Sequence, residues 1–161
     1  NARTFTGNKN DVEAARKMVG GRFHSYPIYH YFVIERSGQV VGYIGWEIHG
    51  GLRRSNPALE LEQLAMDPDS KGQGLGDQLV RRSMEEMIRW IQETNGRIES
   101  DINVFVWAYA LNLPAVGLYS RTFPEVCGYR TVYGNRAEIM LRVQVPWRRS
   151  ARDSEGKGFG D

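Results

Sequence analysis

The sequence predicts a mixed α/β fold, in which strands and helices follow one another along the chain. Two alternating apolar segments, 29–35 and 40–48, flank a Ser-Gly turn and predict a β-hairpin. A third alternating segment, 59–66, runs through a glycine-rich loop into an amphipathic helix. A short apolar segment at 102–107 is followed by a second helix signal, which completes the pattern.

The expected elements, in chain order, are a strand at 3–6, a helix at 10–20, strands at 29–35, 40–48 and 59–66, a helix at 76–94, a strand at 102–107, a helix from 112, and strands at 129–133 and 138–145. The first helix is expected to begin at Asn10, because Glu13 stands three residues later as in a capping box. Gly20 and Gly21 are typical of its end.

The helix at 76–94 has the strongest pattern in the chain. Its apolar residues form one stripe: Leu79, Val80, Met84, Met87, Ile88 and Ile91. The apolar segment at 102–107 is typical of a buried strand. Asn112 is a suitable N-cap for the next helix, and Pro114 is tolerated in its first turn.

Length and composition predict one globular domain with a real core. The chain has 161 residues, 41% of them hydrophobic and 25% charged. The net charge of +2 is too small to predict a nucleic-acid partner. No segment approaches the ~18 apolar residues of a membrane span, and the first residues lack secretory character. A single cysteine, Cys127, is typical of a reducing compartment, so we expect a cytoplasmic protein. We place the domain at 1–145 and a polar tail at 146–161.

The glycine-rich loop predicts an anion site. Gly72, Gly74 and Gly76 stand at every second position, directly before the helix at 76–94. Glycines let several backbone N–H groups point at one anion, and the helix N-terminus attracts negative charge. The spacing is not that of a dinucleotide fingerprint. A P-loop is also excluded, because Asp77 and Gln78 stand where Lys and Ser or Thr are needed. The alternative is a tight strand-to-helix connection that binds nothing.

A second motif, Asn112-x-x-Ala115-x-x-Leu118-Tyr119, accompanies Lys71-x-x-Gly74-x-Gly76. Together they resemble the acetyl-CoA signature of the GNAT N-acetyltransferase superfamily. Lys71 stands where that family usually has Gln or Arg, and the Gly128-Tyr129 pair follows an insertion at 123–127. The resemblance implies a central mixed sheet with flanking helices, in which the parallel strands at 59–66 and 102–107 splay apart around the pantetheine arm. The residues that it assigns to acetyl-CoA are Leu64, Ala65, Met66, Lys71, Gly72, Gln73, Gly74, Leu75, Gly76, Asn112, Ala115 and Tyr119.

Acetyl transfer to an amine needs a base for the ammonium proton and an acid for the departing thiolate. The resemblance assigns the acid to Tyr119. Glu60 and Glu62 share one strand face by the two-residue period and are the candidate bases, with Glu47 as a third. Their alternative role is to bind a cationic substrate or to lie in solvent.

The histidines predict no metal site, because His24, His30 and His49 lack ligand spacing. The segment with His24, Tyr26 and Tyr29 corresponds to the border of the family's acceptor pocket. Acidic and aromatic residues together favour a cationic acceptor.

We therefore expect an acetyl-CoA-dependent N-acetyltransferase acting on a primary amine, in the first instance of a small molecule, by direct attack on the thioester. A protein N-terminus or lysine as acceptor, or a non-catalytic acyl-CoA-binding module, is the alternative. A homodimer is compatible with the sequence. Neither a membrane nor a nucleic acid is expected as a partner.

Overall fold

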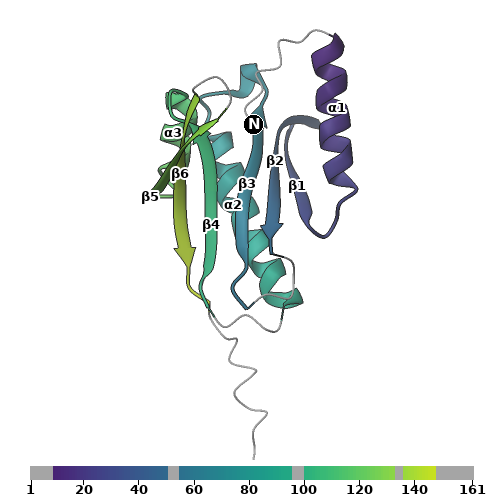
Figure 1. Cartoon of the computed structure of the whole chain (residues 1–161). Coiled ribbons are helices and arrows are strands. Elements are labelled where there is room, and N and C mark those ends of the chain that lie inside the picture. The colour runs from purple at the N-terminus through teal and green to yellow at the C-terminus, as the bar shows by residue number, and fades with distance from the viewer. Residues whose placement is uncertain (1–8, 51–54, 96–99, 133–135, 148–161) are drawn as a thin grey trace, which may run out of the picture.

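The computed structural model describes residues 9–50, 55–95, 100–132 and 136–147 (Figure 1). Its helices and strands are α1 (Lys9–Phe23), β1 (Tyr29–Arg36), β2 (Gln39–His49), β3 (Ala58–Met66), the short η1 (Pro68–Ser70), α2 (Leu75–Thr94), β4 (Ile102–Tyr109), α3 (Leu113–Tyr119), β5 (Glu125–Val132) and β6 (Arg136–Val145). The expected strand at 3–6 and the tail beyond 147 lie outside the described residues.

The six strands form one mixed sheet in the order β1-β2-β3-β4-β6-β5. All neighbours are antiparallel except β3 and β4, which run parallel. The chain passes from β3 to β4 through α2, which lies behind the sheet in the view of Figure 1. The predicted mixed α/β class is confirmed.

The parallel strands β3 and β4 separate toward their carboxyl ends. Their pairing covers Ala58–Leu61 and Asn103–Val106, although β3 continues to Met66 and β4 to Tyr109. On its other side β3 has a bulge, because the pairing with β2 passes from Gly45↔Gln63 to Trp46↔Leu61 and leaves Glu62 as the extra residue. Bulges bend and twist a strand, so this one lies where it helps to open the sheet.

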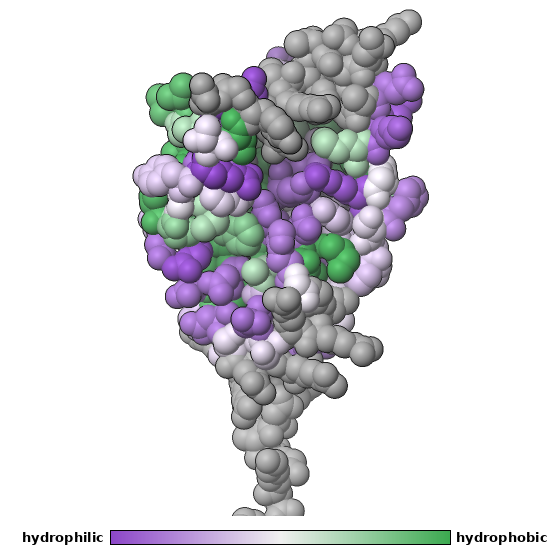
Figure 2. All heavy atoms as spheres, in the orientation of Figure 1, coloured by the Kyte–Doolittle hydropathy of each residue, from purple (hydrophilic) through white to green (hydrophobic). Residues whose placement is uncertain are grey.

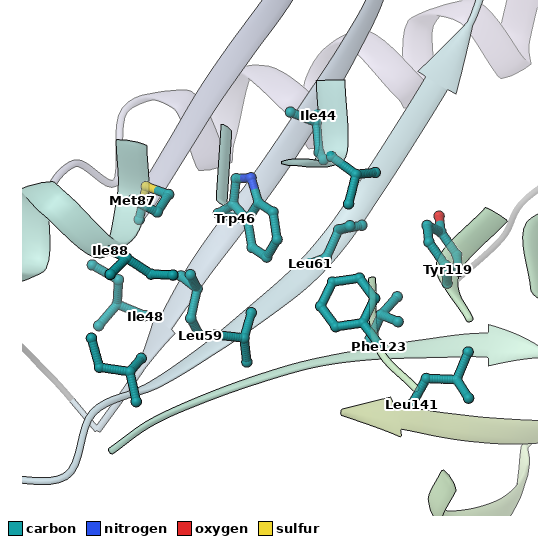
Figure 3. Close-up of a cluster of buried hydrophobic side chains, with 14 of the residues drawn as sticks. Ile44, Trp46, Ile48, Leu59, Leu61, Met87, Ile88, Tyr119, Phe123 and Leu141 are labelled. Carbon is teal, nitrogen blue, oxygen red and sulfur yellow. The ribbon is translucent and has the colours of Figure 1, made fainter. Parts of the chain in front are cut away.

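The core lies between the sheet and α2. Figure 3 shows Trp46, Leu59 and Leu61 from the sheet with Met87 and Ile88 from α2, all buried in one cluster. The Trp46 indole Nε1–H donates a hydrogen bond of 2.9 Å to Ser83 Oγ on α2, which satisfies a buried donor. The apolar stripe predicted for this helix is thus the face that packs.

Most element boundaries lie within two residues of the sequence expectation, and two differ by three residues or more. First, α1 continues through Gly20 and Gly21 to Phe23, so the glycines do not end it. Its last turn carries Arg22, which forms an ion pair with Glu62 on β3, and this tertiary contact favours the additional turn.

None of the helices in the described parts of the chain has the length and apolar character that a membrane span requires.

Second, β5 begins at Glu125, inside the segment 123–127 that interrupts the family pattern. Phe123 before it is fully buried, and Glu125 forms a 2.6 Å ion pair with Arg142 on β6. The apparent insertion is therefore part of the sheet. Trp147 also packs against the core cluster, so the fold extends two residues past the expected boundary at 145.

Candidate active site

The glycine loop ends in an uncapped helix start. Gly72 and Gly74 have φ angles of +74° and +77°, a region that residues with a Cβ rarely adopt. Gly74 is the N-cap of α2, and no side chain caps that helix. The first amide groups of α2 are therefore available to an anion.

Gly76 joins the loop to the other parts of the predicted cofactor site. A Cβ at this position would lie 3.6 Å from Leu118 Cδ2 on α3 and 3.8 Å from Met66 Cγ on β3. The first turn of α2 is thus held against the end of β3 and against α3. The structure brings the two sequence motifs together at this point.

Cationic and polar side chains surround the loop. Lys71 is exposed, and Gln73 donates a hydrogen bond of 3.1 Å to the Asp69 carbonyl oxygen. Arg36 at the end of β1 donates to Gln73 Oε1. The sequence analysis missed Arg36, because only the folding of the β1–β2 hairpin brings it to a loop 37 residues further along the chain.

The end of β3 offers an open strand edge toward β4. Leu64, Ala65 and Met66 pair with β2 on one side, whereas the recorded pairing with β4 stops at Leu61. An extended chain that carries amide groups can add to such an edge as an extra strand. This geometry suits the pantetheine arm, which contains two amides.

Tyr119 is the last residue of α3 and belongs to the core cluster, where its ring centroid lies 6.4 Å from that of Phe123. Asn112 caps α3, and its Oδ1 accepts a hydrogen bond from the Ala115 amide at 3.4 Å. The Tyr119 ring is buried, and burial raises the pKa of Tyr119 to about 12. In Figure 3 its hydroxyl points away from Phe123 and Leu141. The hydroxyl is therefore protonated at neutral pH and can donate a proton or a hydrogen bond.

The sheet face opposite α2 carries the acidic candidates. Leu59 and Leu61 are buried in the core, so Glu60, which alternates with them, faces the other way. Glu62 joins it there, as its ion pair with α1 shows. Glu47 on β2 is the register partner of Glu60. Figure 2, which views this face, shows hydrophilic side chains gathered near its centre.

Glu62 stands at the bulge, where the pairing of β3 with β4 ends. One carboxylate oxygen contacts Arg22, while the other, Oε2, is buried and has no hydrogen-bond partner among the described residues. Burial raises the pKa of the Glu62 carboxyl, nearby Glu47 and Glu60 act in the same direction, and Arg22 opposes them. A buried carboxylate that holds a proton more tightly than usual is typical of a functional site.

Glu60 has a different environment, because His49 Nε2 lies 2.7 Å from its Oε2. His49 Nε2 is also 3.8 Å from Glu47 Oε2. Within the part of the chain that the structure describes, these three side chains are the one group that could hold a metal ion, with ligand atoms all within 4.8 Å of one another. Strand pairing creates this group, so no sequence spacing reveals it. The hydrogen bond between His49 and Glu60 accounts for the arrangement without an ion.

Aromatic side chains border the acidic group. Tyr29 hydrogen-bonds to Glu47, and burial together with this bond raises the pKa of Tyr29 to about 12. Tyr31 donates to Gln63 Oε1 at 3.4 Å. The sequence analysis missed Tyr31, although the two-residue period of β1 puts it on the same face as Tyr29. Phe105 on β4 lies next to His49, with ring centroids 5.6 Å apart.

The other residues expected near the acceptor lie elsewhere. Tyr26 packs against Trp90 of α2, with ring centroids 6.2 Å apart. His24 is exposed beside Phe23. Of His24, Tyr26 and Tyr29, it is Tyr29 that contacts the acidic group, through its hydrogen bond to Glu47.

The arrangement combines a helix start without a recorded side-chain cap, a parallel strand pair that separates, and a buried, protonated tyrosine on α3, the helix that lies against the first turn of α2. Residues 3–123 match the sequence model of the acetyltransferase (GNAT) family. The chain belongs to the GNAT family. Acetyltransferases of the GNAT family take their acetyl group from acetyl-CoA.

One curated relative is a Bacillus subtilis (strain 168) protein provisionally named as a ribosomal protein bS18-alanine N-acetyltransferase. It is 30% identical over 108 residues, which are 66% of this chain and 61% of the relative. The chain thus spans about three-fifths of that relative's length.

Solved GNAT structures have the same fold. The Escherichia coli ribosomal-protein-S18-alanine N-acetyltransferase aligns with a TM-score of 0.63 and 16% identity, over 89% of this chain and 94% of its own. Nourseothricin acetyltransferase aligns with a TM-score of 0.56 and 21% identity, over 74% of this chain and 67% of its own. At these identities the likeness concerns the fold and not the acceptor.

Proposed function

We propose that this protein is an N-acetyltransferase that moves the acetyl group of acetyl-CoA to a primary amine, by direct attack of the neutral amine on the thioester. The observation that carries the proposal is the placement of Glu62 at the point where β3 and β4 separate, between the glycine loop and the acidic face. This position supports a base that reaches the thioester of a donor bound along the end of β3. We also propose a cytoplasmic location, because a single cysteine is typical of a reducing compartment.

The donor is held by the glycine loop and the strand edge. The pyrophosphate binds to the amides of residues 71–76 and to the first turn of α2, with Lys71 and Arg36 adding positive charge. The pantetheine amides pair with the backbone of Leu64, Ala65 and Met66. Asn112 and Ala115 hold the first turn of α3 in place beside the arm.

The acceptor loses a proton before it attacks. An alkylamine has a pKa of about 10.4, so at neutral pH it arrives almost entirely as an ammonium ion. Glu62 takes this proton, because its pKa is raised and its free oxygen faces no competing donor. Glu60, which is already bonded to His49, is the second candidate, and Glu47 is the third.

Tyr119 assists the leaving group. A thiol has a pKa of about 8.5 in water. Full proton transfer from a tyrosine with a pKa of about 12 would then be uphill by about three orders of magnitude. Tyr119 therefore acts as a hydrogen-bond donor to the developing thiolate, and its proton follows if the thiolate, removed from water, becomes more basic than a free thiolate.

The acceptor class has two candidates. Three carboxylates and two tyrosines on one face favour a small molecule that carries a positive charge near the reacting amine. The similarity to the bS18-alanine acetyltransferase favours a protein N-terminus instead. Thiol release from acetyl-CoA should be measured with polyamines, monoamines and a peptide that begins with alanine. Turnover with none of these would contradict the proposed function.

Glu62→Gln is expected to lower kcat/KM at pH 7 by about tenfold and to recover most of the loss near pH 10, where the amine is already neutral. This loss is smaller than the ~10²-fold or more of a complete acid–base effect, because Glu60 and Glu47 remain. Glu60→Gln is the paired variant, and Glu85→Gln on the exposed face of α2 is the control. If both strand variants keep the wild-type pH profile, neither carboxylate is the base and Glu47→Gln is tested next.

Removal of metal ions is expected to leave the rate unchanged, because His49 and Glu60 already satisfy each other. The rate of thiol release before and after dialysis against EDTA checks this. A loss of rate that zinc restores would show instead that Glu47, His49 and Glu60 hold a required ion.

A further inference from the structure

We propose that Glu62, Tyr29 and Tyr31 form the binding site for the ammonium group of the acceptor, and that Arg22 occupies this site until the acceptor replaces it. The inference deepens the proposed function and rests on it for the identity of the ligand as a substrate. It concerns a side chain of α1, which no sequence motif includes.

Arg22 has the contacts that a bound cation would have. Its guanidinium forms an ion pair with Glu62 and a hydrogen bond with Tyr31. Its Cζ lies 5.5 Å from the centroid of the Tyr29 ring. A carboxylate together with aromatic faces is the usual recognition surface for an alkylammonium or guanidinium group. The protein's own arginine thus shows that a cation fits at this place.

Arg22 does not satisfy the site completely. Within the described parts of the chain, Glu62 Oε2 is buried and has no hydrogen-bond partner, although Arg22 contacts the other oxygen of the same carboxylate. An ammonium group carries three N–H donors around one nitrogen and can serve both oxygens from a position between them. Because Arg22 contacts one oxygen, the other stays open to the N–H donors of an incoming ammonium.

Arg22 can also leave at low cost. Its side chain is 26% exposed, so part of the guanidinium already contacts water. It belongs to the last turn of α1, and the residues that follow, Phe23 and His24, are exposed. Ion pairs that are partly open to solvent contribute little net free energy. Rotation of one side chain toward solvent opens the site.

The exchange would couple acceptor binding to proton removal. While Arg22 is in place, its guanidinium occupies one oxygen of the Glu62 carboxylate. Once an ammonium replaces it, the same carboxylate faces the proton that must be removed, with Glu47 and Glu60 nearby. Arg22 is thus a specificity residue that keeps neutral and anionic molecules from competing for Glu62.

The test measures by calorimetry the binding of butylammonium chloride to the full chain in the presence of CoA. Because a resident competitor lowers apparent affinity, Arg22→Gln is expected to bind butylammonium about tenfold more tightly than the unmodified protein. Arg16→Gln, an exposed position on the same helix, removes an equal charge and is expected to change nothing. Equal or weaker binding by Arg22→Gln would overturn the inference.

A second variant covers the case in which Arg22→Gln folds poorly, which a thermal melt would reveal. Glu62→Gln removes the charge that any cation needs at this site and is expected to weaken butylammonium binding at least tenfold. Unchanged binding would place the cation elsewhere and overturn the inference. Neither measurement requires turnover, so a cation site without any thiol release would contradict only the proposed function.

Discussion

Gly76→Asp is expected to lower the affinity for CoA by about a hundredfold while the chain stays folded. Gly76 is the second residue of α2, where an acidic side chain is compatible with the helix dipole. Its Cβ would meet Leu118 and Met66 at ordinary contact distances. The new carboxylate would lie beside the pyrophosphate. Two like charges about 4 Å apart near a protein surface repel by about 4 kcal/mol before salt screening, and 1.4 kcal/mol is a factor of about ten.

Gly76→Ala is the matched control, because it adds the Cβ without the charge and should bind CoA almost normally. Calorimetry with CoA measures both variants, and circular dichroism confirms their fold. Gly74→Asp is a poorer test, since its φ of +77° would strain any residue with a Cβ. If folded Gly76→Asp binds CoA with normal affinity, the pyrophosphate does not bind at this loop.

Tyr119→Phe is expected to lower kcat by about 10²-fold or more, which is the effect of a positioned acid, with CoA affinity nearly unchanged. The phenyl ring fills the same buried space, so packing against Phe123 is kept. Because burial raises the pKa of Tyr119 to about 12, the hydroxyl stays protonated from pH 6 to pH 10. The wild-type rate should therefore show no alkaline decline caused by Tyr119.

Steady-state kinetics with saturating acetyl-CoA and calorimetry with CoA separate the two effects. Tyr129→Phe is the control, because Tyr129 on β5 is 73% exposed and lies outside the site. If Tyr119→Phe keeps the wild-type kcat, Tyr119 only packs in the core, and water is the proton donor.

The sequence by itself determined the parts of this protein that depend on local pattern. The stripe of α2 could be predicted because apolar residues recur with the helical period, and the anion loop could be predicted because glycines precede a helix start. The two-residue period correctly put Glu60 and Glu62 on one face of β3. The two family motifs extended these predictions to Tyr119 and to acetyl-CoA.

Local pattern failed where a distant contact outweighed it. The glycine pair at 20 and 21 predicted the end of α1, yet the helix continues to a turn that binds β3 through Arg22. The strand expected to begin at 129 begins at Glu125, where the ion pair between Glu125 and Arg142 joins it to β6.

Only the tertiary structure decided how the three carboxylates differ. Glu60 and Glu62 are equivalent by sequence period, but β2 brings His49 to one of them and α1 brings Arg22 to the other. The bulge at Glu62 and the end of strand pairing depend on the register with both neighbouring strands. Burial, charge neighbours and free hydrogen-bonding atoms are properties of residues far apart in the chain, and they separate the candidate base from its equally spaced neighbour.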